Sequence, residues 1–290
     1  MRTNDIFKAS EEGDLKSVQA VVEAFESRAP WMRIGEVPPV SQTDRHGQTP
    51  LFNAVMTNQL DVARYLIGKG ADINARDHHE NTPLHFIPNN GKDMASLLIQ
   101  SGANVNIGGS DGRKPLHNTG SAEIAQVLLD HGATVDSRTK YGETPLHLAA
   151  CHGVTDLMKT FIQSGADVNA TMKGGDTPLH HAVRFNEPDA INLLIEHGAK
   201  EDLKNSYNYS PRDYSTMNGQ YAPQGLYIDN EGCDEVLSTA CQKRDAAKSK
   251  EELQQKLGEL ATQWKPSDCK DSTTEEQQQE QRHETRRRLM

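Results

Sequence analysis

Histidine is the side chain in this sequence with the most obvious capacity for chemistry, because twelve are present and four recur at a nearly constant spacing. The recurrent positions are His85, His117, His147 and His180. A zinc site needs ligands within about 2.0–2.1 Å of one ion. If each histidine sits on its own repeated unit, neighbouring rings lie one helix-packing distance apart, ~8–10 Å, and cannot converge. Adjacent pairs at 78–79 and 180–181 point apart, so the sequence predicts no metal site.

Two other stretches could suggest catalysis or nucleotide binding. Cys151 lies close in sequence to His147 and His152, and a histidine can activate a thiol nucleophile. Nothing beside Cys151 marks an oxyanion-stabilising site. The glycine-rich run 108–114 lacks the Gly-Lys-Ser/Thr ending of a phosphate-binding loop, and no strand precedes it. We therefore predict no catalytic residue and no cofactor, and we interpret the run as a turn.

These residues belong to two short phrases that return along the chain in a fixed order. The first is Thr-Pro-Leu-His, complete at 82–85, 144–147 and 177–180. Its Thr-equivalent positions are 49, 82, 114, 144, 177 and 210, spaced by 33, 32, 30, 33 and 33 residues. The second phrase, Gly-Ala-x-Val/Ile-Asn/Asp, starts at 70, 102, 132, 165 and, in a weaker form, at 198. A shared period in two phrases indicates a repeat architecture.

One unit, 144–170, shows how the phrases would make structure. Thr144 can cap a helix that begins at Pro145, where a missing N–H costs nothing. Gly153 ends this short helix. A second helix follows, with apolar residues on one face at 157, 158, 161 and 162, and Gly165 supplies the left-handed residue that stops it. One helix pair cannot bury its apolar face alone, so we expect the units to stack.

With two phrases in register over about 33 residues, the chain resembles the ankyrin-repeat family from about residue 4 to 243. The resemblance implies an all-α solenoid of helix-turn-helix repeats with β-turn or hairpin connections. It also implies that the motif histidines are hydrogen bonders that stabilise turns. The expected domain, 1–243, comprises an N-terminal cap (4–27), an insertion (27–40), repeats starting at 49, 82, 114, 144 and 177, and a degenerate repeat from 210.

Three irregularities interrupt the period. The insertion carries Trp31, either a recognition anchor on an exposed loop or a side chain that covers neighbouring helix ends. Pro88 stands where a helical hydrogen bond would form. The unit at Lys114 lacks three residues, so its first helix should be barely one turn long. The region 86–120 is therefore either a binding recess or a tolerated drift of the repeat.

Beyond the repeats, Ser249 and Glu252 have the spacing of a capping box and predict an amphipathic helix over 249–264, which is either a lid on the last repeat or a docking element. Residues 265–290 are almost free of apolar side chains, so we expect a disordered tail. The tail ends in a basic cluster, Arg286-Arg287-Arg288. Such a cluster is a solvated end, a nuclear-import patch, or an export address resembling those of bacterial effectors delivered to host cells.

Composition limits the classes of partner. The net charge is −10, and residues 246–290 carry equal numbers of acidic and basic residues, so the excess lies on the repeats. This balance disfavours nucleic acid and favours a neutral or basic protein partner. No apolar run of about 18 residues predicts a membrane span. Four cysteines without framework spacing and a polar N-terminus predict a cytoplasmic protein, with nuclear and secreted locations as alternatives.

The resemblance implies protein–protein recognition through turn tips and the concave ends of the first helices. The tip residues carried over are Arg45, His46, His78, His79, Lys140, Tyr141, Met172, Lys173, Ser206 and Tyr207. The concave residues are Met56, Thr57, Asn89, Asn90, Cys151, His152, Arg184 and Phe185. We expect a monomeric adaptor rather than an enzyme, with Tyr141, Arg184, Phe185 and Tyr207 as anchors. The alternatives are a substrate-recognition or inhibitory subunit of an enzyme complex, or a bacterial effector.

Overall fold

The computed structural model describes residues 4–216, 220–221, 227–228 and 233–263. The chain divides into two compact units, Met1–Cys241 and Gln242–Met290. All of the helix pairs and the hydrophobic core described below belong to the first unit.

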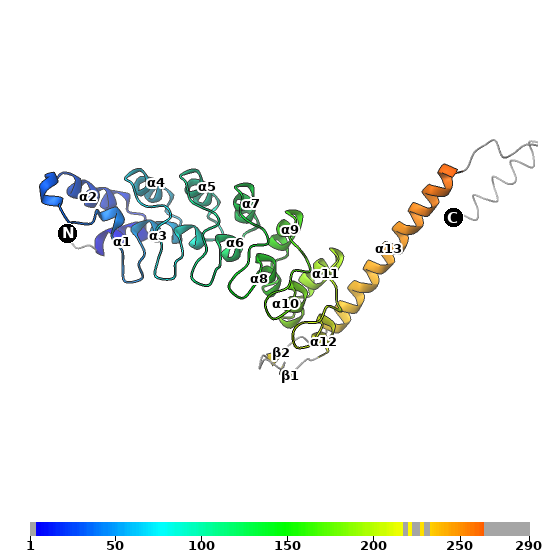
Figure 1. Ribbon diagram of the computed structural model, residues 1–290. Helices are drawn as coiled ribbons and strands as arrows, with labels where there is room; N and C mark the ends of the chain where they lie inside the picture. Colours follow the sequence, from blue (N-terminus) through cyan, green and yellow to red (C-terminus); the bar gives the residue numbers. More distant parts are fainter. Residues whose placement is uncertain (1–3, 217–219, 222–226, 229–232, 264–290) are drawn as a thin grey trace, which may run out of the picture. The chain divides into compact units, whose positions relative to one another are not determined.

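The first unit is a row of helix pairs in which the first helices form one line and the second helices another (Figure 1). The first helices are α1 (Asn4–Glu12), α3 (Pro50–Met56), the 3₁₀ turn η3 (Pro83–Phe86), α6 (Pro115–Asn118), α8 (Pro145–Cys151), α10 (Pro178–Arg184) and α12 (Pro211–Ser215). The second helices are α2 (Leu15–Glu26), α4 (Leu60–Gly68), α5 (Lys92–Gln100), α7 (Ala122–Asp130), α9 (Thr155–Gln163) and α11 (Pro188–Glu196).

The only strands among the described residues are a short antiparallel pair, β1 (Gln220–Tyr221) and β2 (Tyr227–Ile228). In this pair Gln220 lies opposite Ile228, and Tyr221 opposite Tyr227. Because each strand is two residues long, the pair adds nothing to the core architecture. The predicted all-α solenoid is confirmed.

The Thr-Pro-Leu-His phrase forms the start of η3, α8 and α10 and also links each of them to the next repeat. Backbone N–H groups of Thr82, Thr144 and Thr177 donate to Nδ1 of the histidine three residues later, at 3.0, 3.2 and 3.0 Å. A backbone amide can only donate, so Nδ1 accepts and the proton resides on Nε2. In His147, Nε2 then donates to the carbonyl of Asp176 in the following turn, at 3.1 Å. The predicted turn-stabilising role of the motif histidines is confirmed.

The Gly-Ala-x-Val/Ile-Asn phrase links repeats on the second-helix side. Gly165, with a φ of 88°, ends α9 in the left-handed region. Four residues later, the Asn169 amide donates to the Gly198 carbonyl at 3.1 Å and accepts from the Lys200 N–H at 2.9 Å. Asn74 makes the same two-sided bridge to its following repeat. The two phrases recur in register because each joins one unit to the next.

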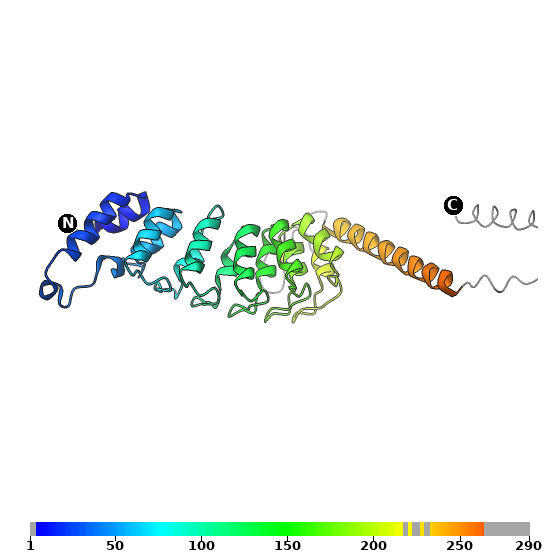
Figure 2. The same ribbon diagram turned by 90° about the horizontal axis from the view of Figure 1, so that it is seen from above.

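The helix pairs follow one another along the row (Figure 2). A continuous hydrophobic core runs between the two lines of helices, and every repeat contributes to it. The largest fully buried apolar side chains come from helices along the whole row: Ile6, Leu51, Phe52, Leu66, Met94, Leu98, Leu116, Ile124, Leu128, Leu146 and Phe161. Each helix pair therefore depends on its neighbours for burial, as in other solenoids.

The insertion after α2 is an ordered loop with two 3₁₀ turns, η1 (Pro30–Arg33) and η2 (Pro39–Ser41). The Arg28 guanidinium spans the loop, donating to both carboxylate oxygens of Glu36 at 2.6 and 2.8 Å and to the Met32 carbonyl at 2.9 Å. Trp31 lies in η1, but its side chain is outside the described atoms. Its role as an anchor stays a prediction.

The C-terminal helix begins earlier than the sequence predicted. α13 (Cys233–Gln263) is one continuous helix that passes through both the expected boundary at 243 and the expected helix start at Ser249. The Ser249 hydroxyl donates to the Asp245 carbonyl at 3.0 Å, as a serine inside a helix does. The predicted cap at Ser249 is wrong, because the run before it contains good helix formers and no breaker.

Part of α13 belongs to the first unit, where Leu237, Ala240 and Cys241 join the core. The side chains of the predicted amphipathic stripe, at 253, 257, 260 and 264, lie outside the described atoms, as does the whole predicted disordered tail, 265–290. The choice between a lid and a docking helix stays open.

One turn of the repeats carries a strained residue. The position after each turn tip is left-handed, and glycine or asparagine occupies it in five turns: Gly47, Gly112, Gly142, Gly175 and Asn208. In the second turn this position is Glu80, with a φ of 61°. An L-residue other than glycine, asparagine or aspartate is disfavoured there by roughly 1–2 kcal/mol.

Replacing Glu80 with glycine is therefore expected to stabilise the protein by about 0.5–1 kcal/mol, after the greater freedom of glycine in the unfolded chain is subtracted. The ion pair lost to Arg76 is exposed on both sides and contributes little. Urea unfolding followed by circular dichroism measures the change. The opposite substitution, Gly142→Ala, is the control and should destabilise, because a Cβ there would lie 2.9 Å from the backbone nitrogen of Lys173. An E80G variant no more stable than the natural chain would contradict the strain argument.

Candidate protein-binding surface

Six hairpin-like turns project from the row of helix pairs, and each presents two residues at its tip. We call these twelve residues the tip edge: Arg45, His46, His78, His79, Ser110, Asp111, Lys140, Tyr141, Lys173, Gly174, Ser206 and Tyr207. The first residue of each tip donates its backbone N–H to the carbonyl of the second residue in the preceding tip, at 2.7–2.9 Å. These five bonds join all six tips into one continuous rim.

Four of the six turns are also held from below, by a capping side chain at their base. At the base of the first turn, one Asp44 carboxylate oxygen accepts the N–H groups of His46 and Gln48 at 2.8 and 2.9 Å. Asp77 and Asn205 cap their own turns through the same pair of bonds. Because these backbone N–H groups are used internally, the exposed side chains are the main groups that the tips offer to a partner.

The tip edge is well exposed, and its largest side chains are two tyrosines. Tyr141 is 52% exposed and Tyr207 is 50% exposed, while all other tip residues except Asp111 and Gly174 are also exposed. The Lys140 ammonium lies 5.0 Å from the centre of the Tyr141 ring, within cation–π range. A rigid row of exposed aromatic and cationic side chains is the kind of surface that protein partners bind.

The sequence misplaced one tip by one residue and omitted another. Met172 is half-buried at the base of its turn, where its N–H donates to Asp176 and its carbonyl accepts from Gly175, both at 2.9 Å. The true tip pair there is Lys173 and Gly174, so the assignment of Met172 was wrong. Two adjacent glycines follow Lys173, so the sequence alone did not show which two residues form the tip of this turn. The tip at 110–111 was omitted because its turn has glycine in place of the usual capping residue.

The concave residues lie at the ends of the first helices as expected, with different exposures. Thr57, Asn89, Asn90, His152 and Phe185 are exposed, whereas Met56 and Cys151 are half-buried. The Thr57 hydroxyl donates to the carbonyl of Asn53, so it serves the end of α3. Phe185 is the single large apolar side chain of this set that is open to a partner.

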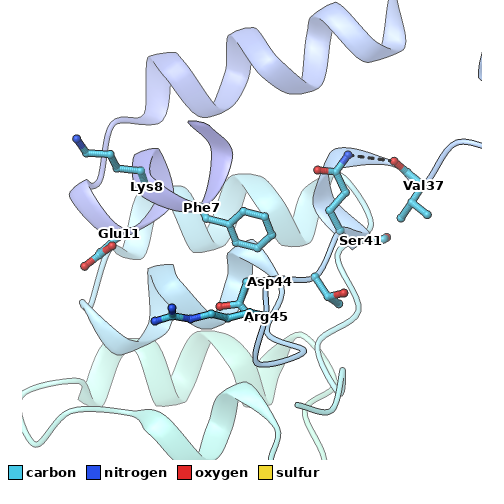
Figure 3. A pocket seen from close by; sticks show the side chains of 9 residues that line it. Phe7, Lys8, Glu11, Val37, Ser41, Asp44 and Arg45 are labelled. Atoms are coloured by element: carbon cyan, nitrogen blue, oxygen red, sulfur yellow. Dashed lines mark hydrogen bonds between the residues drawn. The ribbon is translucent and has the colours of Figure 1, made fainter. Parts of the chain in front are cut away.

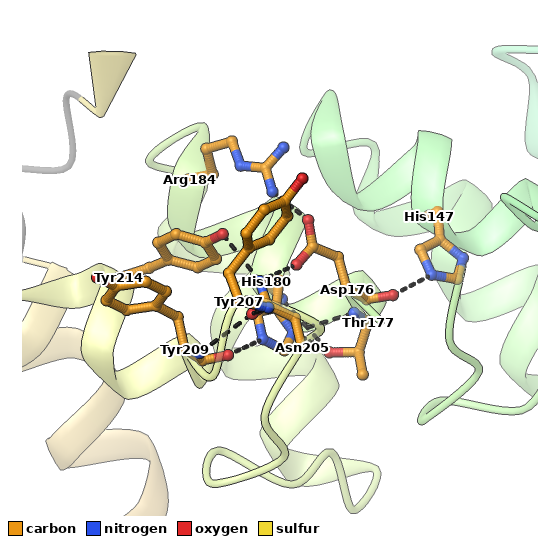
Figure 4. Close-up of polar contacts among 9 residues, drawn as sticks. All are labelled: His147, Asp176, Thr177, His180, Arg184, Asn205, Tyr207, Tyr209 and Tyr214. Carbon is orange, nitrogen blue, oxygen red and sulfur yellow. Dashed lines mark hydrogen bonds and ion pairs between the residues drawn. The ribbon is translucent and has the colours of Figure 1, made fainter. Parts of the chain in front are cut away.

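Arg184 is not the exposed anchor that the sequence predicted. Its side chain is 9% exposed and forms an ion pair with the equally buried carboxylate of Asp176 (Figure 4). The guanidinium also lies 5.4 Å from the centre of the Tyr214 ring. Asn205 donates to the other Asp176 oxygen at 2.6 Å. This network joins two successive turns and the helices α10 and α12, so Arg184 stabilises the fold rather than a partner.

The residues that could have suggested thiol chemistry are not arranged for it. Burial raises the pKa of the Cys151 thiol above its ordinary value, which is opposite to the shift of an activated nucleophile. Both ring nitrogens of His147 are already hydrogen-bonded, to Thr144 and to the carbonyl of Asp176. Burial lowers the pKa of His147 to about 4. Cys151 and His147 therefore do not form a reactive pair.

The short unit at Lys114 produces a recess of about 490 Å³ on the first-helix side. α6 ends after four residues and leaves one side of α8 uncovered. Pro145, Leu148 and Leu157 supply apolar lining, and Asn118 and His152 supply polar lining. The structure therefore contains a recess beside region 86–120, and its role as a binding site stays a prediction.

A second hollow, of about 990 Å³, lies at the N-terminal end of the tip edge (Figure 3). Phe7 and Val37 contribute apolar surface, and Lys8, Glu11 and Arg45 contribute charges of both signs. It forms because the insertion holds the chain away from α1 before the first tip. The tip edge thus begins beside a hollow that the sequence did not predict.

In the described parts of the chain, no three His, Cys, Asp or Glu side chains come together as a metal site would require. None of the described helices combines the length and apolar character needed to cross a membrane.

Comparison with known families identifies the fold. Residues 46–78 and 79–110 each match the family model described as Ankyrin repeat, and residues 118–205 match the model described as Ankyrin repeats (3 copies). These segments cover more than half of the 290 residues. The protein belongs to the ankyrin-repeat family. The ankyrin-repeat fold is a general protein-interaction scaffold and is not typically catalytic.

Ankyrin-repeat proteins of several kinds are similar to this chain. It is 28% identical over 123 residues to the human Transient receptor potential cation channel subfamily A member 1, covering 41% of this chain and 11% of the channel subunit. It is 32% identical over 118 residues to the Putative ankyrin repeat protein FPV223 of Fowlpox virus (strain NVSL), covering 40% and 83%. With human Inversin it is 30% identical over 122 residues, covering 40% and 12%. The chain therefore spans about a tenth of the channel subunit and of Inversin.

Solved ankyrin-repeat domains share the architecture. The ankyrin repeat domain of Bcl-3, a member of the IkappaB protein family, has a TM-score of 0.58 and 28% identity, covering 72% of this chain and 92% of that domain. The human ASB11 ankyrin repeat domain has a TM-score of 0.62 and 22% identity, covering 81% and 96%. The second likeness shows the fold alone.

Proposed function

We propose that this protein is a non-catalytic adaptor that binds one partner protein through the tip edge, with Tyr141 and Tyr207 as the main anchors. The observation that carries the proposal is the continuous rim of six tips, tied by backbone hydrogen bonds, that holds two half-exposed tyrosines in fixed positions. Rigid aromatic side chains lose little entropy on binding, so they are frequent hot spots.

A non-catalytic role is supported by how the titratable side chains are used. The motif histidines form hydrogen bonds that stabilise the turns of the following repeats. Burial lowers the pKa of His117 and of His147 to about 4. The buried carboxylate of Asp176 is paired with Arg184. Because these groups are committed to the fold, they offer no acid, base or nucleophile to a substrate.

The partner would be a cytoplasmic protein. This chain would bind it as a monomer. Membership of an enzyme complex, as its substrate-recognition or inhibitory subunit, is the second candidate, and the recess beside α8 favours it because such a hollow can hold a side chain of a catalytic subunit. Delivery as a bacterial effector would place the same tip edge in a host cell.

The double variant Tyr141→Ala/Tyr207→Ala is expected to reduce recovery of the partner about tenfold or more in affinity purification with quantitative mass spectrometry, because one aromatic hot spot contributes about 1–2 kcal/mol or more. Gln100→Ala/Gln163→Ala, at exposed positions on second helices, is the matched control and should retain the partner. Phe185→Ala removes the exposed apolar side chain of the concave side, so loss of the partner in this variant alone would indicate binding there and not at the tips. Unchanged recovery by a folded double-tyrosine variant would contradict the proposal.

A further inference from the structure

We propose that the tip edge recognises an acidic, Asp/Glu-rich segment of the partner protein. This inference rests on the proposed function and names the chemistry of the partner. It also reverses the expectation from net charge, since a chain of charge −10 favours a neutral or basic partner when only its total is considered.

The tip edge carries charge of the opposite sign to the chain as a whole. Its fully charged residues are Arg45, Lys140, Lys173 and one acid, Asp111. Three further tip residues are histidines. The acidic excess lies elsewhere, and the first turns of α4, α5, α7, α9 and α11 each contain one acid: Asp61, Asp93, Glu123, Asp156 and Asp189. There the carboxylates complement the positive ends of the helix dipoles.

The carboxylates near the tips are already engaged within the protein. Asp111 pairs with Arg113 at 3.0 Å, and Glu80 pairs with Arg76 at 2.8 Å. Asp176 is buried against Arg184, and Glu143 accepts from the Thr139 hydroxyl at 3.1 Å.

The tip cations, in contrast, have no carboxylate partner among the described residues. The Lys140 ammonium lies over the Tyr141 ring, and the Arg45 guanidinium donates to His46. Lys173 makes neither an ion pair nor a side-chain hydrogen bond within the described structure. Unpaired cations on an acidic protein remain available to an external anion, and they attract it more strongly as ionic strength falls.

The fourth and fifth tips form the centre of this surface. Lys140 and Lys173 occupy equivalent positions on adjacent tips, and the Lys173 N–H is bonded to the Tyr141 carbonyl at 2.9 Å. Arg138 crosses between the same two turns, where its guanidinium donates to the carbonyls of Gly142 and Thr171 at 3.0 and 2.6 Å. Lys140 therefore lies over the exposed Tyr141 ring, and Lys173 and Arg138 belong to the same two turns. An extended acidic peptide could pair with the cations while an adjacent side chain packs on the ring.

Nucleic acid is also anionic, but the distribution of charge favours protein. Strong non-specific binding to nucleic acid comes from neutralising many phosphates, whereas the central tips offer three cations on a chain of charge −10.

The test is selection of phage-displayed random 12-residue peptides on the full chain, followed by fluorescence anisotropy with the best peptide. We expect selected peptides to be more acidic than the input library. Lys140→Glu/Lys173→Glu should weaken binding about tenfold or more, because attraction is replaced by repulsion at two sites. The control Lys16→Glu/Arg64→Glu, on exposed positions of α2 and α4, changes net charge equally and should stay within about twofold.

The outcomes separate this inference from the proposed function. Neutral or basic peptides whose binding is lost in the Tyr141→Ala/Tyr207→Ala variant would overturn the acidic partner and leave the tip edge as the binding surface. Selected peptides that bind both the tyrosine and the lysine variants normally would overturn both proposals. A 20-nucleotide single-stranded DNA that binds more tightly than the best acidic peptide, with the same loss in the lysine variant, would replace the acidic protein by nucleic acid.

Discussion

Replacing Arg184 with methionine is expected to destabilise the protein by about 3 kcal/mol or more, because the substitution leaves the Asp176 carboxylate buried without its counter-charge. Both side chains of the pair are 9% exposed, so water cannot take the place of the guanidinium. Asp176 would retain only the bond from Asn205. Urea unfolding followed by circular dichroism measures the free energy of unfolding.

The double variant Arg184→Met/Asp176→Asn is the control for this prediction. It removes both charges and keeps the shape of the Asp176 side chain, so it should recover a large part of the lost stability. Recovery would show that the penalty comes from an uncompensated charge rather than from lost packing over Tyr214. An R184M variant as stable as the natural chain would contradict the structural role of Arg184 and reopen its role as an anchor.

Lowering the pH from 7 to 5 is expected to reduce the free energy of unfolding by about 4 kcal/mol. Burial lowers the pKa of His117 and of His147 to about 4. Between about pH 6.5 and pH 4 the unfolded chain therefore binds protons that the folded chain does not. Stability is complete above about pH 6.5 and is lost progressively toward pH 4. At pH 5 the loss is about 2 kcal/mol for each of these two histidines.

Three other buried histidines change stability in the same direction, because burial also lowers the pKa of His85, of His180 and of His181. Protonation of Nδ1 would place a donor against the backbone N–H that it now accepts. Urea titrations at pH 7, 6 and 5 measure the effect, and hydrogen exchange locates the repeats that open first. Equal stability at pH 7 and pH 5 would contradict the neutral, hydrogen-bonded state of the motif histidines.

The variant His181→Leu tests whether the loss of stability at low pH comes from protonation of buried histidines or from other effects of acid. His181 is buried, and neither ring nitrogen has a hydrogen-bond partner among the described residues, although the His147 backbone is close enough to raise the pKa slightly. The equivalent residue of the preceding repeat is Leu148. We expect H181L to be more stable than the natural chain by about 1–2 kcal/mol at pH 7. Its stability should also fall less between pH 7 and pH 5.

The repeat architecture could be predicted from the sequence because its signals are local. A cap such as Thr144, a first-turn Pro145 and a stop such as Gly165 act within a few residues, and they recur at each period. The motif histidines could also be assigned correctly, since their partner is the turn of the next unit. Helix continuity at Ser249 was mispredicted for a local reason as well: a capping pair inside a run of good helix formers does not start a new helix.

The candidate surface was only partly predictable. Tyr141 and Tyr207 lie at exposed tips as expected. The sequence predicted that Arg184 is exposed at the end of its first helix, but Asp176 and Tyr214, brought close by the fold, draw it into a buried network. The recess beside α8 could not be predicted from the sequence alone. A short helix such as α6 leaves a hollow only where the next helix is longer, and the structure is needed to show which neighbour leaves α8 uncovered.

The sequence by itself determined the solenoid, its repeat boundaries and the hydrogen-bonding role of its histidines, because each depends on residue type within a repeating window. The tertiary structure decided which side chains are open to a partner and what charge they present. Asp111 and Asp176 are neutralised by Arg113 and Arg184 of their own repeats. Lys140 and Lys173, in contrast, have no carboxylate partner among the described residues. The net charge of the whole chain is therefore negative, whereas the tip edge, through which we propose that the partner binds, is positive.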